Sequence, residues 1–161
     1  MVKTKNGNVM KEKVWIFIIE KALTPLELNN LYAECQRFVS HWKSHEMPVQ
    51  ASVELYKNRL LIFRNNEIFN PIGGCATDNL FRFVQDLEKK YNTSLINRRL
   101  VVYEKDNELK LADFRQIDTL VKNGEITDDT IIYNTAIINS DEWAEFKKPY
   151  KDSWLRIIHQ D

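Results

Sequence analysis

Cysteine and long apolar runs are scarce in this chain of 161 residues, and each shortage excludes a class of protein. The only cysteines are Cys35 and Cys75, too few for the disulfide framework that holds small secreted domains together. No apolar run approaches the roughly 18 residues of a membrane-spanning helix, and no signal-peptide core follows the charged N-terminus. We therefore expect a cytoplasmic protein with reduced thiols and no membrane partner.

Net charge is also absent. The 23 basic and 23 acidic side chains cancel, and neither half of the chain is basic enough to provide the electrostatic surface that nucleic acid requires. The composition, 43% hydrophobic and 29% charged, is typical of a soluble globular protein. A chain of this length can bury a core without help from a metal. We expect no nucleic-acid partner, no cofactor and no metal.

Glycine is scarce as well, and its positions bear on catalysis. The glycines are Gly7, Gly73, Gly74 and Gly124, and none stands in the frame G-x-x-x-x-G-K-[ST] of a nucleotide-binding P-loop. No paired carboxylates, Ser-His-Asp order or C-x-x-C motif stands out either. By motif, therefore, the chain is not an ATPase, and the sequence favours a protein that is not an enzyme.

The segments that are present begin with a strand and a strongly marked helix. The apolar run KVWIFII (13–19) predicts a strand that is covered on both faces. Thr24 and Glu27 then form a capping box, with Pro25 at the first helical position. Apolar residues at spacings of three and four follow, so the sequence predicts a helix that runs to about Ser44.

Further segments extend this pattern. The residues predict a hairpin of strands at 49–55 and 59–65, a second helix over 79–91 and another strand at 99–105. The order is β-α-β-β-α-β, which is the ferredoxin-like arrangement. We therefore expect an α+β fold of this class.

The rest of the chain predicts a smaller α+β extension. LADFRQIDTLVKNG (111–124) predicts a helix closed by Gly124, and DTIIYNTAII (129–138) predicts a strand. SDEWAEF, which begins at Ser140, predicts a short capped helix. The expected organisation is a disordered tail (1–11), a ferredoxin-like domain (12–105) and a small extension packed on it (106–161).

Several runs of sequence resemble an uncharacterised family of small bacterial proteins. They are NRLLIF (58–63), GGCATDNLFRFVQDLE (73–88), GEITDDTIIYN (124–134) and a later Ser-Trp pair. Members of that family often carry the automated label "ABC transporter ATPase". Because this chain has no P-loop, the resemblance implies no ATPase activity here.

A second resemblance covers about a third of the chain. LADFRQIDTLVKNGEITDDTIIYN (111–134), followed by Trp143, is similar to bacterial GYF-type domains, in which a helix, a glycine, an I-x-x-D-T motif and a strand precede a tryptophan. Tyr103 is the candidate for the aromatic residue that stands ahead of the helix in those domains. GYF-type domains generally bind proline-rich peptides through an aromatic patch, so the resemblance implies a GYF-like extension with a peptide partner.

The loop NPIGGCATDN (70–79) is the candidate for chemistry. With Thr77 or Asp78 as the helix N-cap, Cys75 would lie just ahead of the helix, where free amides and the helix dipole favour a thiolate or a bound anion. Gly73 and Gly74 would let the backbone approach a ligand closely. The structural alternative is that the glycines only make a turn and Cys75 packs as a small buried side chain.

Two other groups of side chains are candidate sites. His41 and His45 would lie on one face of the first helix, as metal ligands do, but the pair has no third ligand in the motif, so we expect no metal site. Trp143, Tyr150 and Trp154 cluster near the C-terminus and are candidates for contact with a partner. The same aromatics could instead anchor the tail onto the main sheet.

These observations favour a non-catalytic module that binds a protein or peptide through the aromatics of the tail. The alternative is a small enzyme or anion-binding protein, with Cys75 as a reactive thiol and Gly73, Gly74, Thr77 and Asp78 around its ligand. A third interpretation is a homodimer in which two sheet faces pair.

Overall fold

The computed structural model describes residues 11–67 and 70–158, and it is a mixed α+β structure with antiparallel sheets. The expected disorder of residues 1–11 lies almost wholly outside the described residues. The chain divides into two compact units, Met1–Ile96 with Ile138–Asp141, and Asn97–Ile137 with Glu142–Asp161. No helix of the described residues is both long enough and apolar enough to cross a membrane.

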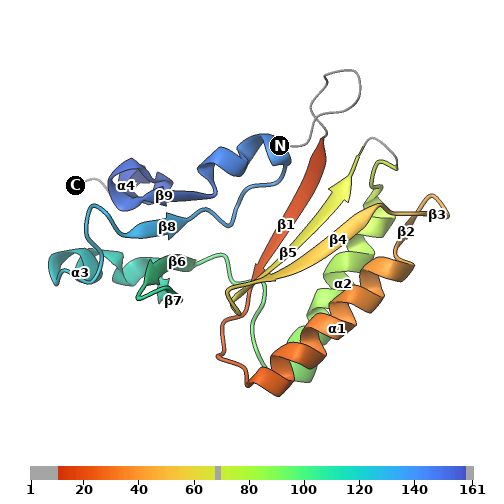
Figure 1. Ribbon diagram of the computed structural model, residues 1–161, viewed down its shortest axis with the longest axis horizontal. Coiled ribbons are helices and arrows are strands. Elements are labelled where there is room, and N and C mark those ends of the chain that lie inside the picture. The colour runs from red at the N-terminus through yellow and green to blue at the C-terminus, as the bar shows by residue number, and fades with distance from the viewer. Residues whose placement is uncertain (1–10, 68–69, 159–161) are drawn as a thin grey trace. The chain divides into compact units, whose positions relative to one another are not determined.

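The first unit is a three-stranded antiparallel sheet with two helices on one face (Figure 1). The strand order is β1-β5-β4, so β5 is central and the adjacent strands β4 and β5 form the expected hairpin. A small two-stranded ribbon, β2 and β3, follows the first helix. The elements are β1 (Glu12–Ile18), α1 (Pro25–His41), β2 (Lys43–Ser44), β3 (Met47–Pro48), β4 (Ala51–Tyr56), β5 (Leu60–Asn66) and α2 (Gly74–Tyr91).

The start of α1 follows directly from the sequence. The Thr24 hydroxyl accepts a hydrogen bond from the Glu27 amide at 3.1 Å, and the Glu27 carboxylate accepts one from the Thr24 amide at 3.0 Å. This confirms the predicted capping box with proline in the first turn. The helix ends at His41 rather than near Ser44, because Lys43 and Ser44 pair with β3.

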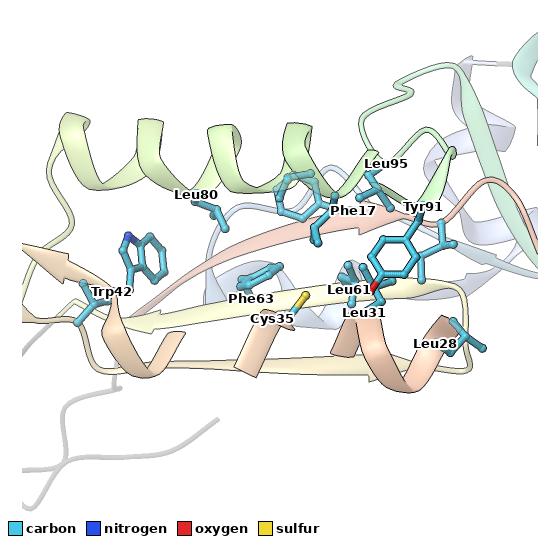
Figure 2. Packing of buried hydrophobic residues seen from close by; sticks show 14 of the residues in the cluster. Phe17, Leu28, Leu31, Cys35, Trp42, Leu61, Phe63, Leu80, Tyr91 and Leu95 are labelled. Carbon is cyan, nitrogen blue, oxygen red and sulfur yellow. The ribbon is translucent and has the colours of Figure 1, made fainter. Parts of the chain in front are cut away.

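The core of the first unit lies between the sheet and its two helices (Figure 2). Phe17 and Phe63 point from the sheet toward the helices and meet edge to face, with ring centroids 5.8 Å apart. Leu31 and Cys35 of α1 are fully buried against this layer, as the predicted apolar stripe requires. The helices are therefore held mainly by burial of one apolar face each.

The second unit is a four-stranded sheet with short helical segments. Its strand order is β7-β6-β8-β9, all antiparallel. Its core gathers Tyr103, Ile117 and Tyr150 with neighbouring aliphatic residues. The elements from residue 97 onward are β6 (Leu100–Lys105), β7 (Glu108–Asp113), η1 (Phe114–Gln116), α3 (Ile117–Lys122), β8 (Ile131–Tyr133), η2 (Ser140–Glu145), β9 (Lys147–Pro149), η3 (Tyr150–Asp152) and α4 (Trp154–Ile158).

The strand expected to complete a ferredoxin-like sheet lies elsewhere. Leu100–Lys105 pairs with β7 and β8, not with β1. The physical reason is local: Asp106 and Asn107 both have positive φ and form a two-residue turn that returns the chain at once alongside β6. The turn also explains a second error, because residues 111–113, expected at the start of a helix, end the strand β7.

Other segments occupy part of the edge of β1. The Val14 amide donates to the Ile138 carbonyl at 2.9 Å, and the Ile18 amide donates to the Leu95 carbonyl at 3.2 Å. The Glu12 amide donates to the hydroxyl of Ser140, the residue expected to cap a helix. Since Ile137 and Ile138 lie outside β8, the strand expected over 129–138 is much shorter, Ile131–Tyr133.

Candidate functional site

The loop before α2 differs from expectation in where the helix begins. Gly73 is the N-cap, with an extended backbone (φ −90°), and the helix starts at Gly74. Neither Thr77 nor Asp78 caps it. The Thr77 hydroxyl donates to the Gly73 carbonyl at 3.1 Å, and Asp78 is exposed on the second turn. Cys75 therefore lies within the first turn of the helix rather than ahead of it.

The β2–β3 ribbon contacts the segment that leads into α2. The Gly73 amide donates to the hydroxyl of Ser44 at 2.9 Å, a contact between residues distant in sequence. The Asn70 side-chain amide donates to the carbonyls of Ser44, Met47 and Pro48, each at 3.1 Å. These bonds hold the residues just before α2 against the ribbon, although no side-chain hydrogen bond caps the helix at Gly73.

The two glycines of the loop have different roles. A Cβ added at Gly73 would lie 3.1 Å from Nε2 of His45 and 3.6 Å from the Ser44 hydroxyl, so glycine allows the ribbon to approach closely. A Cβ at Gly74 would meet no atom within 4 Å. The structure thus brings one imidazole to the start of α2, a neighbour that no sequence spacing indicated.

His45 is separated from the other histidine with which it was paired in sequence. His41 ends α1, whereas His45 lies in the β2–β3 turn with φ +54°. The expected common helix face therefore does not exist. The described residues contain no group of three or more side chains that could hold a metal ion.

The two cysteines have opposite environments. Cys75 is exposed, so the alternative in which it packs as a buried side chain is wrong. Cys35 is fully buried on the inner face of α1, and burial raises the pKa of its thiol to about 12. Only Cys75 is therefore accessible to a thiol-reactive molecule.

The aromatic residues of the tail contribute mainly to packing. Tyr150 is buried in the core of the second unit, and Trp154 packs against the same cluster, with its indole N–H donating to the Tyr133 carbonyl at 3.3 Å. Trp143 is half-buried and meets Phe146 edge to face at 5.0 Å. The three side chains do not form the exposed patch that a partner surface requires.

A groove of about 310 Å³ lies in the second unit, beside β7 and the η1–α3 segment. Its apolar part comes from Tyr103, Leu111, Ala112 and Leu120, and its polar part from Arg115, Gln116 and Thr119. Phe114, next to Arg115, is 39% exposed. A mixture of apolar floor and polar rim is typical of a peptide-binding surface.

The groove adjoins a free sheet edge. Strand β7 is terminal in its sheet, and the two-residue turn makes Lys105–Glu108, Tyr103–Lys110 and Val101–Ala112 the hydrogen-bonded pairs. Backbone groups of Leu109 and Leu111 consequently point away from β6. These groups make no hydrogen bond to any other described residue.

Asp113 fixes the polar rim of the groove. Its carboxylate accepts from Arg115 Nε at 3.0 Å and from Arg99 at 2.8 Å, and it also caps η1 through the Arg115 amide. The side-chain hydrogen bond from Arg115, its backbone hydrogen bond and the contact with Arg99 hold the pKa of Asp113 well below its usual range. Two guanidinium groups thus share one carboxylate.

The sequence named Tyr103 only as the candidate aromatic of a GYF-type domain, and the groove and its edge strand were not predicted. The signal was present: Asp106-Asn107 suits a two-residue turn, and apolar and polar residues alternate through Glu108–Lys110. No protein-family model, curated protein or solved structure matches the chain, so the candidate site rests on its own geometry.

Proposed function

We propose that the protein is a cytoplasmic, non-catalytic module that binds a protein or peptide through the groove beside β7. The observation that carries this proposal is the combination of the groove with the unpaired backbone of Leu109 and Leu111. An extended chain recognises such an edge by main-chain hydrogen bonds and places side chains in the adjoining hollow. The resemblance of residues 111–134 to peptide-binding GYF-type domains favours the same kind of function.

The groove is a different contact surface from the three tail aromatics, Trp143, Tyr150 and Trp154, that the sequence suggested. Tyr150 is 2% exposed, so a partner could reach it only by disrupting the core. Thr119 and Arg115, in contrast, are exposed at the rim of the groove. Binding through exposed side chains leaves the core of the second unit intact.

Selection of phage-displayed random 12-residue peptides on the immobilised full chain tests the proposal. We expect peptides that bind the natural chain and lose affinity for Thr119→Arg, because an arginine there fills the groove. Thr119→Ser, which keeps the hydroxyl and adds no bulk, serves as the matched control. Failure to enrich peptides, or equal binding to all three proteins, would contradict the proposal.

Reactivity at Cys75 is a second candidate function, and the specific observation that favours it is the imidazole of His45 beside Gly73. A histidine can act as the base of a thiol at a helix N-terminus, and His45 approaches the N-cap residue two positions before Cys75. We expect iodoacetamide to alkylate Cys75 faster than a model thiol at neutral pH, and His45→Ala to slow the reaction. Cys35 is the internal control and should stay unmodified in the folded protein.

Mass spectrometry after timed alkylation gives the rate at each cysteine separately. A Cys75 no faster than the model thiol, or one unaffected by His45→Ala, would remove the reactive-thiol function. The peptide-binding proposal would be untouched by that result, since its groove lies in the second unit.

A further inference from the structure

We infer that the partner is an extended segment with carboxylate side chains, which adds to the second sheet as a strand along β7. This inference rests on the proposed function and names the class of partner. It is carried by the backbone direction of β7, by the position of the groove and by the arrangement of charge at its rim.

The backbone of β7 determines the form of the partner. Leu109 and Leu111 each direct an amide and a carbonyl away from β6, and alternate residues along an added strand would meet these groups. The remaining residues, Glu108, Lys110 and Ala112, use their backbone groups to pair with β6. The free edge therefore offers two donors and two acceptors in the spacing of a β-ladder.

The groove determines which side chains of the partner are buried. Tyr103 and Ala112 face α3, and the groove that they line with Leu120 lies on that side of β7. A side chain of an added strand that points to the same face would enter the groove. An aliphatic side chain fits because the floor is apolar.

The charge at the rim of the groove determines which polar side chains the partner carries. Arg99 and Arg115 are 63% and 76% exposed and share the single carboxylate of Asp113. Nearby acidic side chains are also paired, Glu108 with Lys110 at 3.3 Å and Asp118 with Lys122 at 2.9 Å. One guanidinium charge is thus in excess, and guanidinium groups bind carboxylates with particular directionality. A segment rich in lysine would meet repulsion at the same place.

Fluorescence anisotropy with two labelled eight-residue peptides tests the inference on the full chain. One peptide alternates valine and aspartate, and the other alternates valine and lysine. At about 0.15 M salt we expect the aspartate peptide to bind about tenfold more tightly than the lysine peptide. Equal affinities, or a preference for lysine, would overturn the acidic character of the partner.

Two further peptides test strand addition without altering the protein. One is the aspartate peptide N-methylated on its odd-numbered residues, and the other is the same peptide N-methylated on its even-numbered residues. Each pattern blocks the amides along one edge of the extended peptide only. We expect one of the two methylated peptides to lose about tenfold in affinity and the other to retain its affinity, because only one edge of the bound peptide faces β7. Equal effects of the two methylation patterns would overturn strand addition.

Variants locate the site. Arg115→Gln should weaken binding of the aspartate peptide about fivefold, whereas Lys147→Gln, the same charge change on β9 at the opposite edge of the sheet, should not. Equal effects of these variants would overturn the assignment to β7.

If phage-selected peptides bind without charge preference, the inference fails while the proposed function stands. If neither selected nor designed peptides bind, both fail.

Discussion

At the scale of single residues, the shortage of glycine has a structural cost in the turns. The two-residue turns His45–Glu46 and Asp106–Asn107 need positive φ at both positions, and the chain fills them without glycine. Every residue with a Cβ is crowded in this region, but asparagine and aspartate tolerate it because their short side chains hydrogen-bond the local backbone, which glutamate does not do. Glu46, with φ +64°, is therefore in an unfavourable conformation.

Replacement of Glu46 by glycine should stabilise the protein. Removing the Cβ relieves a cost of roughly 1–2 kcal/mol, and the greater freedom of glycine in the unfolded chain returns roughly 0.5–1 kcal/mol of this. We expect a net gain of about 1 kcal/mol in the free energy of unfolding, measured by urea titration. Glu46→Ala is the control, since it removes the same carboxylate but keeps the Cβ. A gain of equal size in both variants would show that charge, not backbone conformation, is responsible.

At the scale of elements, a polar contact joins α1 to α2 at the edge of the core. The Tyr91 hydroxyl donates to Glu34, and Lys90 Nζ lies 2.9 Å from the other carboxylate oxygen. Burial acts to raise the pKa of Glu34, but the hydrogen bonds from Tyr91 and Lys90 outweigh it, and the pKa is lowered from its ordinary 4.5. The contact therefore stabilises the fold most when Glu34 is ionised.

Tyr91→Phe should consequently show a pH-dependent loss of stability. A carboxyl group with a lowered folded-state pKa stabilises above its unfolded pKa, and this contribution disappears as the pH falls through the folded value. We expect a loss of roughly 1.5–3 kcal/mol at pH 7 and a smaller loss at about pH 3, both from urea unfolding.

Tyr32→Phe is the matched control for that experiment. The Tyr32 hydroxyl donates to the Val53 carbonyl at 3.1 Å, an acceptor that does not titrate. Loss of this hydrogen bond should lower the free energy of unfolding by the same amount at both pH values. If Tyr91→Phe also costs the same at both, the ionised state of Glu34 does not contribute to the contact.

At the scale of the whole molecule, burial argues against a dimer built from paired sheet faces. Val14, Ile18, Leu60 and Ile62 alternate with the residues that face α1 and α2, so they lie on the opposite face of the first sheet. Each is at most 6% exposed in a single chain. Side chains with so little exposed area contribute little to an interface with a second copy.

We therefore expect a monomer in solution. Light scattering coupled to size exclusion should give a mass near 19.1 kDa at all loading concentrations. A mass of about twice that value would restore the homodimer. In that case the free edge of β7 would be the first surface to test, by repeating the measurement on Leu111→Pro, which removes an outward amide.

The sequence by itself determined the features that depend on neighbours in the chain. The capping box at Thr24, the apolar stripe of α1, the β4–β5 hairpin and the positive φ of Gly124 after α3 arise from interactions over a few residues. The order of helix and strand patterns likewise indicated the mixed α+β class, and the chain length indicated an ample core. Such interactions are encoded locally, and distant parts of the chain rarely reverse them.

Tertiary structure decided the features in which several segments competed for the same groups. The Ser44 hydroxyl binds the Gly73 amide just ahead of α2, and β6, which sequence order assigned to the first sheet, pairs with β7 instead. Packing likewise placed Tyr150 in a core instead of on a surface. In each case a backbone amide, a strand edge or an aromatic ring had more than one suitable partner in sequence, and the choice depended on which partner the rest of the fold brought within hydrogen-bonding or packing distance.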